Sequence, residues 1–167
     1  MENFKNAMSN LANTVSILSI LDEQPFGSFL AVTISSLVSS SVNENEEEVM
    51  FVLKNDSLAE IRLAQKPNFS INVLADSASQ IATLYGSSPR DRIQQNLIDN
   101  KEWIIEESVP KFLEAHVFLK CEYVESIRRF SSTIIFARVK SLDIHKSTYP
   151  LIHFQRSYCR LNVSKSF

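Results

Sequence analysis

Hydroxyl side chains alternate with apolar ones along Val32–Ser40, which reads Val-Thr-Ile-Ser-Ser-Leu-Val-Ser-Ser. In an extended chain this pattern makes one face polar, and hydroxyl groups on such a face can donate hydrogen bonds to a bound molecule. The same pattern also fits an edge strand with one face in water, and the run alone leaves both interpretations open. Nucleophilic hydrolysis is disfavoured, because no serine lies in a GxSxG turn.

Other common motifs of nucleotide, metal and redox sites are missing from the sequence. The two glycines, Gly27 and Gly86, cannot build a GxGxxG turn or a P-loop. The three histidines are scattered without the spacing of metal ligands, so we predict no metal site. The two cysteines lie far apart with no CxxC pair, which favours a reducing cytoplasm over a disulfide framework.

Length and charge limit the class of protein. A chain of 167 residues with 44% hydrophobic content can bury one sizeable core, and we predict a single domain over residues 1–167. The formal net charge of −2 creates no positive field, so neither nucleic acid nor a membrane surface is expected as a partner. No apolar run approaches the roughly 20 residues that span a bilayer. The amino terminus lacks the pattern of a secretory signal, so we expect a soluble, cytoplasmic protein.

The hydroxyl run must be positioned by a fold that is mainly β with short helices. Segments dense in branched and aromatic residues, separated by turn residues, predict the strands. We expect them at residues 15–21, 26–36, 49–53, 69–74, 115–127, 130–142 and 150–163. The first two are expected to form a β-hairpin, and residues 86–110 a long irregular excursion.

Three helices are expected from apolar spacing and capping residues. The first covers residues 2–12, with Phe4, Ala7, Met8 and Leu11 facing inward. The second covers residues 57–64 and is capped by Asp56, with Leu58, Ile61 and either Leu63 or Ala64 turned inward. The third follows Ser77–Gln80, which has the spacing of a capping box.

The order of several motifs resembles the flavin reductase-like family, the small reductase partners of two-component monooxygenases. The strand Thr14–Leu18 followed by the hydroxyl run is similar to the start of that family. Asn55 and Ser57 match a turn and helix start where the family's Ser-x-Thr pair commonly meets the flavin phosphate. Further motifs match in order along nearly the whole chain: Phe69–Leu74, Gln80–Ala82, Asp91–Ile93, Thr133–Val139 and Pro150–Phe154, ending at Tyr158.

This resemblance implies an FMN-binding split β-barrel of Greek-key type that works as a homodimer. It implies FMN as the cofactor, with FAD as the alternative, and NADH or NADPH as the reductant. A flavin ring needs an apolar slot with a few donors, and its phosphate needs N–H groups or a cation, which the helix start near Ser57 would supply. The cofactor-binding residues that the resemblance implies are Thr33, Ile34, Ser35, Ser36, Lys54, Asn55, Ser57, Asn72, Arg92 and Tyr158. Capping by Ser57, a surface charge at Lys54 and core packing of Asn72 remain the alternative roles.

The sequence departs from the family pattern at the reductant site. Before the Thr-Ile strand the family usually carries Gly-Asp-His, with the histidine near the nicotinamide, and this chain has Phe130-Ser131-Ser132. Ser132 therefore stands at the histidine position, and no catalytic residue is assigned with certainty. Ala137 and the run Gln155–Ser157 also replace family glycines. Flavin binding is expected to survive these changes better than NAD(P)H oxidation.

Two functions follow from these residues. The first is a flavin reductase that uses NAD(P)H to reduce bound FMN and supplies reduced flavin to a partner monooxygenase. The alternative is a flavin-binding or flavin-carrier protein without NAD(P)H oxidation, in which Ser132 marks the loss of the nicotinamide site. A third interpretation is a split barrel that has lost flavin and binds another ligand. NADH and NADPH are both compatible with the motifs.

Overall fold

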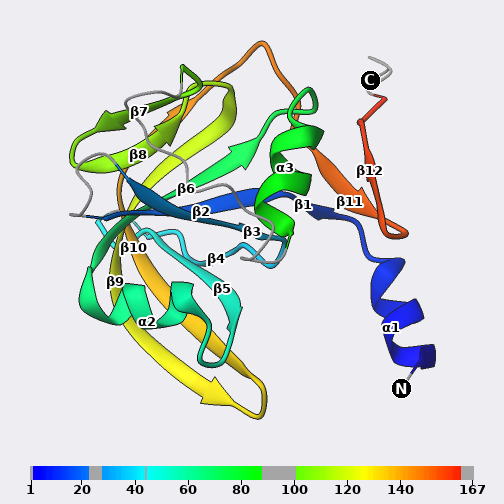
Figure 1. The fold of residues 1–167 in the computed structure, drawn as a ribbon, viewed down its shortest axis with the longest axis horizontal. Coiled ribbons are helices and arrows are strands. Elements are labelled where there is room, and N and C mark those ends of the chain that lie inside the picture. The colour runs from blue at the N-terminus through cyan, green and yellow to red at the C-terminus, as the bar shows by residue number, and fades with distance from the viewer. Residues whose placement is uncertain (1, 23–27, 44, 88–100, 163–167) are drawn as a thin grey trace.

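The computed structural model describes residues 2–22, 28–43, 45–87 and 101–162, which are mainly β with three short helices (Figure 1). The helices are α1 Glu2–Ser9, α2 Leu58–Gln65 and α3 Ser79–Gly86. The main sheet consists of β2 Ser16–Leu21, β3 Phe29–Ile34, β4 Val38–Ser41, β5 Glu48–Lys54, β6 Asn68–Leu74, β9 Ala115–Arg129 and β10 Ser132–Ile144. The remaining strands are β1 Asn13–Thr14, β7 Trp103–Glu106, β8 Val109–Phe112, β11 Ile152–Phe154 and β12 Ser157–Cys159. The predicted class is confirmed.

The main sheet is antiparallel, with the strand order β3–β2–β6–β9–β10–β5–β4. Its two outermost strands, β3 and β4, are consecutive in the chain and are joined by residues 35–37. The four Cα–Cα steps of this connection span at most roughly 14 Å. The two edges of the sheet therefore lie close together, and the sheet is curled so that β3 approaches β5.

The strand register confirms the predicted β-hairpin and shows a second, longer one. β2 pairs with β3 from Ser16 opposite Ile34 to Leu21 opposite Phe29. β9 and β10 form the longest hairpin, which closes with Arg129 opposite Ser132. β10 then pairs with β5, so the hairpin lies beside the strand that leads into α2.

Two hydrophobic clusters lie on opposite faces of the sheet. Ile17 belongs to one cluster and Leu18 to the other, because successive residues of a strand face opposite sides. One cluster packs against α2 and includes Phe51 and Phe69, whose rings meet edge to face with centroids 5.9 Å apart. The other packs against α3 and the β7–β8 hairpin and includes Trp103. The clusters hold α2 and α3 on opposite sides of β3.

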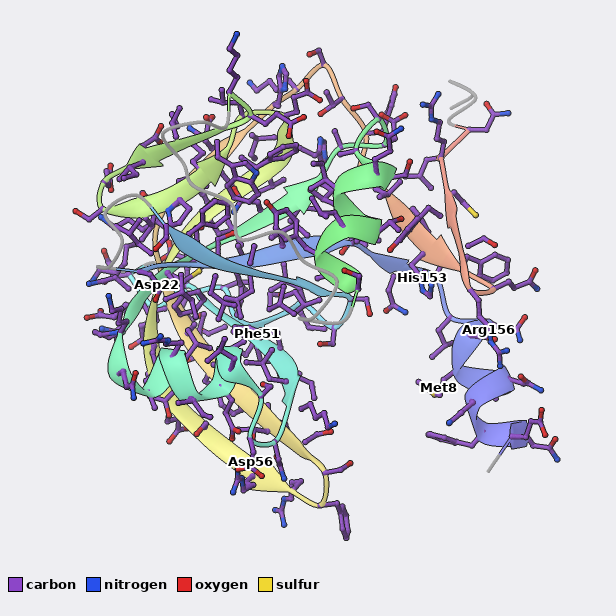
Figure 2. All side chains as sticks on the ribbon, viewed as in Figure 1. Met8, Asp22, Phe51, Asp56, His153 and Arg156 are labelled. Atoms are coloured by element: carbon purple, nitrogen blue, oxygen red, sulfur yellow. The ribbon has the colours of Figure 1, made fainter. Side chains whose placement is uncertain are left out.

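The prediction that α1 turns its apolar side chains inward is wrong for the isolated chain. Phe4 is 69% exposed and Met8 47% exposed, and α1 buries no residue. Polar groups of the β11–β12 turn hold the helix instead. The Arg156 guanidinium donates from Nη2 to Asn6 Oδ1 at 2.7 Å, and the backbone amide of Gln155 donates to the Ser9 carbonyl at 2.7 Å. Figure 2 shows Met8 of α1 and Arg156 of the β11–β12 turn away from the main sheet.

Several local predictions are corrected by the structure. α2 is capped by Ser57 rather than Asp56, and its inward side chains are Ala59 and Leu63, whereas Leu58 and Ile61 are about half exposed. Ser77 does not cap α3, which has no side-chain cap. β4 and the β7–β8 hairpin were not predicted. None of the described helices is long and apolar enough to cross a membrane.

Candidate functional site

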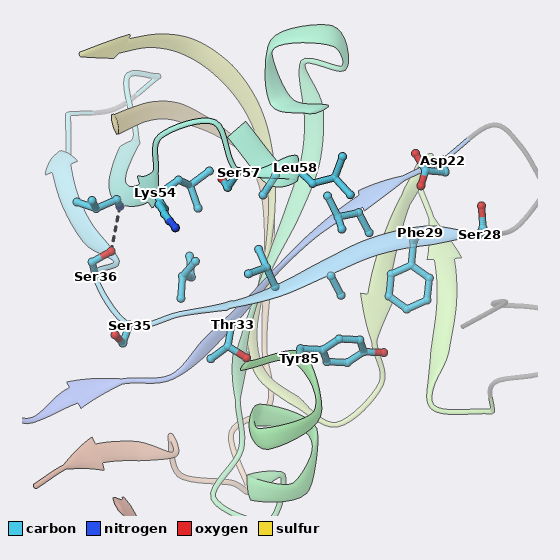
Figure 3. Close-up of a pocket in the computed structure, with 17 residues that line it drawn as sticks. Asp22, Ser28, Phe29, Thr33, Ser35, Ser36, Lys54, Ser57, Leu58 and Tyr85 are labelled. Atoms are coloured by element: carbon cyan, nitrogen blue, oxygen red, sulfur yellow. Dashed lines mark hydrogen bonds between the residues drawn. The ribbon is translucent and has the colours of Figure 1, made fainter. Parts of the chain in front are cut away.

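A cavity of about 530 Å³ opens along the outer edge of β3 (Figure 3). Its size is typical of small-molecule sites, which occupy roughly 300–1,000 Å³. β3 forms one wall, and the end of β5, the start of α2 and one residue of α3 form the others. The lining residues are Asp22, residues 28–36, Val52, Leu53, Lys54, Ser57, Leu58, Ala59 and Tyr85.

β3 is the terminal strand of the sheet and, among the strands that the structure describes, pairs with β2 alone. A terminal strand carries backbone N–H and C=O groups on its outer edge that no neighbouring strand uses. All six residues of β3 line the cavity. The strand therefore brings backbone polar groups as well as side chains to a ligand.

Thr33 faces α3. Its hydroxyl donates a hydrogen bond to the Ala82 carbonyl at 2.9 Å. Gly86 ends α3 beside it, because a Cβ atom on Gly86 would lie 3.7 Å from Thr33 Oγ1 and 4.0 Å from the Tyr158 hydroxyl. The hydroxyl proton of Thr33 is thus used inside the protein, so Thr33 offers a ligand an acceptor rather than the donor that we predicted.

Ser35 and Ser36 lie in the connection after β3. The Ser36 hydroxyl oxygen accepts a hydrogen bond from the Val52 amide at 2.9 Å, which ties this connection to β5. A hydroxyl that accepts still has its own proton to donate. Ser35 is exposed and lines the same end of the cavity. These two residues therefore supply the donors that a ring at this end would need.

The turn from β5 into α2 forms the cationic end of the cavity. Ser57 Oγ accepts from the Glu60 amide at 3.3 Å and so caps the helix. The first N–H groups of a helix have no partner within it, and the helix dipole makes this end partly positive. Leu58 and Ala59, the first residues of α2, line the cavity together with the exposed Lys54. This arrangement suits a phosphate group.

A polar network behind this turn fixes its shape. Thr133 of β10 is buried, and its hydroxyl lies 2.6 Å from Glu60 Oε1 and 2.8 Å from Asn55 Oδ1. Glu60 Oε2 accepts from the Asp56 amide at 2.5 Å, where the backbone is left-handed with φ 57°. Asn55 Nδ2 donates to the Phe130 carbonyl at 2.8 Å. The turn is therefore bound both to its own helix and to the β9–β10 hairpin.

The same contacts favour the charged form of the Glu60 carboxyl group. The hydrogen bond from Thr133 and the guanidinium of Arg128 lower the pKa of Glu60 below its ordinary value, against the opposing effect of desolvation. Arg128 Nη2 lies 2.6 Å from Asp56 Oδ1 and 3.3 Å from Glu60 Oε2. Two carboxylates thus share one guanidinium, and the ammonium of Lys54 stands on the cavity side of the turn.

The structure brings six of the predicted site residues to the cavity wall and leaves Asn55, Asn72 and Tyr158 away from it. Those at the wall are Thr33, Ile34, Ser35, Ser36, Lys54 and Ser57. Asn55 lies behind the wall in the polar network, and Tyr158 lies beyond Thr33, near Gly86. Arg92 is outside the described residues.

Asn72 lies in the core. It is fully buried in β6, where its Oδ1 accepts from the Phe112 amide at 2.9 Å and its Nδ2 donates to the Ser70 hydroxyl at 3.2 Å. These contacts join β6 to β8 and account for a buried amide without a ligand. Asn72 is not a lining residue of the cavity, and the alternative role in core packing describes its position.

Ser132 is the first residue of β10 and pairs with Lys54 of β5 and with Arg129 of β9. It is half-buried and does not line the cavity itself. Its neighbour across the sheet, Lys54, does. A longer side chain at position 132 would therefore start from a strand next to the cationic end.

Several lining residues were not predicted as part of the site. Asp22 and Ser28 lie at the end of the β2–β3 hairpin, and the Asp22 amide donates to the Ser28 carbonyl at 2.9 Å. Asp22 had only the sequence signal of a turn residue, and Ser28 had none. Leu58 was assigned to the core because it fits the apolar spacing of α2, yet it lies half exposed at the cavity.

The cavity fits a flavin mononucleotide in its chemistry. The apolar side chains of β3, Leu58 and Tyr85 suit a planar ring, and Ser35 and Ser36 suit its polar edge. Lys54 and the start of α2 suit the phosphate. No group of three or more potential metal ligands occurs within the ranges that the structure describes.

Comparison with known proteins gives one family and several relatives. The family model described as flavin reductase like domain matches residues 8–162. The chain is 23% identical over 164 residues to the reductase component of an FADH(2)-dependent resorcinol hydroxylase from Rhizobium sp., a match that covers 95% of this chain and 86% of that protein. It is also 23% identical over 159 residues to an FMN reductase (NADH), RutF, from Acinetobacter baylyi, which covers 93% of this chain and 79% of that protein.

A similar fold occurs in a solved structure of the NADH:FAD oxidoreductase SgcE6 from Streptomyces globisporus, in complex with NAD and FAD fragments. The TM-score is 0.84 at 16% sequence identity, and the match covers 99% of this chain and 94% of that chain. At this identity the likeness concerns the fold alone. It extends over the curled sheet and over the strands that carry the cavity.

Proposed function

We infer the function of this chain from its family, because the chain belongs to the flavin reductase like domain family, whose model matches residues 8–162. We propose that it is a flavin reductase that binds FMN and uses NADH or NADPH to reduce it. The observation that carries the proposal is the cavity along β3, where an apolar wall meets a lysine and a helix start at one end. The relatives named as reductases support the same reaction.

Each part of the cavity has a task in this proposal. Lys54 and the first N–H groups of α2 hold the phosphate, and Ser57 aims those groups by capping the helix. Ser35 and Ser36 donate to the polar edge of the ring, and the edge of β3 adds backbone groups. Bound flavin supplies the hydride acceptor. The residues of the chain bind, orient and exclude water, and no general base is required.

The residue at position 132 supports a second candidate function. Serine at position 132 pairs with Lys54, and the family usually has a histidine there. A flavin carrier without NAD(P)H oxidation would need the flavin cavity and no nicotinamide contact. We nevertheless favour the reductase, because one lost positioning contact slows a reaction by tenfold or so rather than abolishing it.

Flavin binding and reduction by NADH test the proposal directly. Equilibrium dialysis should give a dissociation constant below about 100 μM for FMN, which corresponds to roughly −5.5 kcal/mol. Anaerobic addition of NADH or NADPH should then bleach the bound yellow flavin. Binding without bleaching by either nucleotide would favour the carrier. Absence of binding for both FMN and FAD would reject the flavin site.

We further propose that the curled sheet is a split β-barrel of the Greek-key type and that two copies form a homodimer. The closeness of β3 and β5 supports the first statement. The exposed apolar side chains of α1, Phe4 and Met8, support the second, because burying them against another copy would remove apolar surface from water. Sedimentation should give about twice the 19.0 kDa of one chain. A monomer at all concentrations would contradict the dimer.

A partner monooxygenase is the proposed user of the reduced flavin. The relative from Rhizobium sp. is named as the reductase component of a hydroxylase, and this supports such a partner. A cytoplasmic location is also proposed, since Cys121 and Cys159 are both free thiols.

A further inference from the structure

The β9–β10 hairpin ends in a turn of two residues, Phe130 and Ser131, and reaches past α2 (Figure 1). Phe130 has a left-handed backbone with φ 47°, and its side chain is fully exposed. A left-handed backbone is unfavourable for a residue with a bulky side chain. Two-residue hairpin turns favour glycine where φ is positive, and glycine is the residue that the family usually carries at this position. Because the exposed ring cannot stabilise the turn by packing, polar contacts must hold it.

Asn55, in the turn from β5 into α2, supplies those contacts. Its Nδ2 donates to the Phe130 carbonyl at 2.8 Å, and its backbone amide donates to the Ser131 carbonyl at 3.1 Å. Its Oδ1 lies 2.8 Å from the hydroxyl of the buried Thr133. Both carbonyls of the hairpin turn are therefore bound by one residue, and the side chain of that residue is fixed in turn by a buried residue of β10.

A second attachment of the hairpin is weaker. The Arg128 guanidinium lies 2.6 Å from Asp56 Oδ1 and 3.3 Å from Glu60 Oε2. The side chains of Arg128 and Asp56 are both exposed, and ion pairs in water contribute little because solvent screens them. This ion pair also starts from β9, ahead of the two turn residues. The position of the turn therefore depends chiefly on Asn55.

The hairpin turn leads directly into the cationic end of the cavity. Ser132 follows the turn and pairs with Lys54, which lines the cavity. Asn55 is the next residue after Lys54, but it is not a lining residue itself. A displaced turn would thus move position 132 relative to Lys54 and leave the lining side chains in place. Asn55 can influence a bound molecule through the hairpin turn, without touching it.

We propose that Asn55 is a positioning residue for flavin reduction, because it holds the hairpin turn so that position 132 keeps a fixed place beside Lys54. The inference rests on the proposed function, since position 132 is where the family usually has a residue near the nicotinamide. Hydride transfer requires the nicotinamide and flavin rings in a close and defined arrangement. A loosened turn leaves the flavin in its cavity and widens the range of positions open to the nicotinamide. It therefore slows reduction without weakening flavin binding.

Asn55→Ala removes the side-chain contacts, and Asn10→Ala is the matched control. The Asn10 side chain makes the same two kinds of contact: its Nδ2 donates to the Asn6 carbonyl at 2.8 Å, and its Oδ1 accepts from Gln155 at 2.9 Å. Asn10 is not a lining residue of the cavity. In each variant, equilibrium dialysis measures the dissociation constant of FMN. Single-turnover bleaching by saturating NADH or NADPH measures the rate of flavin reduction.

The turn itself is tested on the flavin-free chain by limited digestion with trypsin, which cleaves after Arg128 and Arg129 at the end of β9. The cleavage rate rises when the end of the hairpin opens more often. Fluorescence of Trp103, the single tryptophan of the chain, shows whether a variant is folded, because this side chain is buried in the cluster beside α3. This readout requires neither flavin nor nucleotide.

We expect Asn55→Ala to slow bleaching about tenfold and to speed tryptic cleavage about tenfold, as for the loss of one or two hydrogen bonds. The dissociation constant of FMN should stay within about twofold of the native value, and Asn10→Ala should match the native chain in all three measurements. FMN binding weakened about tenfold would show that Asn55 contacts the flavin and would overturn the positioning role. Unchanged bleaching or unchanged cleavage would overturn it as well.

A substitution at the turn separates positioning from a general loss of stability. Glycine at position 130 removes the cost of the left-handed backbone, so Phe130→Gly in the Asn55→Ala background should restore most of the lost rate and of the lost resistance to trypsin. Phe130→Gly alone is the reference for the absence of the phenyl ring. No restoration would overturn the proposal. If Asn55→Ala does not fold, Asn55→Asp, which keeps the Oδ1 acceptor and removes the Nδ2 donor, is digested instead, and unchanged cleavage would count against the proposal in the same way.

A failure of the proposed function is distinguishable from a failure of this inference. If neither nucleotide bleaches the native chain, the reductase is rejected, and the digestion of the flavin-free chain still decides the role of Asn55. Faster cleavage that Phe130→Gly reverses would support its hold on the turn and on position 132. Cleavage at the native rate would overturn that role together with the reaction.

Discussion

The two ends of the cavity differ in how their polar groups are held. At the end formed by Lys54–Ser57, the side chains behind the wall are bonded to each other: Asn55 and Glu60 both meet Thr133, and Glu60 also meets the Asp56 amide. At the Asp22–Ser28 end, the described contacts are a backbone hydrogen bond and one long ion pair, and the enclosed Ser28 hydroxyl has no hydrogen-bond partner among the described residues. The first end is held by a network of side-chain hydrogen bonds, and the second is held by fewer described side-chain contacts.

This difference affects how tightly each end of the cavity can bind a ligand. A site whose groups are already fixed loses little conformational entropy when a ligand binds, so its contacts contribute most of their strength to affinity. The turn at Lys54–Ser57 is the better candidate for an anchor that all flavins share.

Ser57→Glu should have the largest effect, on flavin affinity. A carboxylate at the start of α2 would stand beside the phosphate, and two unit charges about 4 Å apart repel by about 4 kcal/mol at an effective dielectric constant of 20. We expect the dissociation constant of FMN to rise at least about a hundredfold. Equilibrium dialysis measures it. Gln65→Glu, at the other end of α2, is the control and should change affinity by less than about twofold, and an unchanged affinity in Ser57→Glu would remove Ser57 from the site.

Glu60→Gln should lower stability by about 1–3 kcal/mol, because it removes a charged acceptor from Thr133 and the Asp56 amide. The midpoint of thermal unfolding should fall by about 2–4 °C for each kcal/mol. Arg62→Gln, which breaks the half-exposed ion pair at the other end, should cost less than about 1 kcal/mol. Equal losses in the two variants would contradict the contrast between the ends.

The pH dependence of the same variant gives an independent check. The folded state lowers the pKa of Glu60 below its ordinary value, chiefly through the hydrogen bond from Thr133. The stabilisation by this carboxylate is therefore fully present above its unfolded pKa of about 4.5 and is lost as the pH falls through the lower folded value. The difference in unfolding free energy between the native chain and Glu60→Gln should shrink below pH about 4.5. A difference that grows on acidification would refute the assignment.

Local sequence patterns predicted most of the sheet, because its strands are dense in branched residues and bounded by turn residues. They failed where tertiary contacts decide. The apolar spacing of Phe4 and Met8 correctly indicated a helix, but spacing alone does not say what covers its apolar face. β7 and β8 were missed because Pro110 and polar residues interrupt their apolar pattern, although Trp103 anchors the hairpin in the core.

The candidate site was predictable where it consists of one continuous segment. The run around Thr33 to Ser36 and the turn at Lys54 to Ser57 both reach the cavity. Asp22 and Tyr85 come from a hairpin end and a helix that meet β3 only in the folded chain, so no short-range signal marked them as lining residues. Asn72 fitted a family motif, and only the fold revealed that its hydrogen bonds join core strands.

Ser132→His should produce the next largest effect, on the rate of flavin reduction. An imidazole beside Lys54 can stack on the nicotinamide or donate to it, and one positioning contact is worth about 1–2 kcal/mol, or roughly ten- to thirtyfold in rate. Single-turnover bleaching by NADH and by NADPH measures this rate. Ser131→His, one residue earlier in the exposed turn, is the control. If the native chain already bleaches rapidly and Ser132→His is no faster, a histidine at this position is not needed to orient the nucleotide.

The smallest effect concerns the hydroxyl run itself. Ser36 keeps its proton for a ligand, whereas the hydroxyl of Thr33 donates to the Ala82 carbonyl. Loss of one hydrogen bond typically costs about 0.5–1.5 kcal/mol. Ser36→Ala should therefore raise the dissociation constant of FMN about fivefold. Thr33→Val should leave FMN affinity nearly unchanged and lower the free energy of unfolding instead, because it removes the hydrogen bond that joins β3 to Ala82 of α3. Fluorescence titration and urea unfolding of both variants separate the two roles. If Thr33→Val weakens FMN binding as much as Ser36→Ala does, the acceptor of Thr33 contacts the flavin, and the division of the run into a ligand-binding and a helix-holding hydroxyl is wrong.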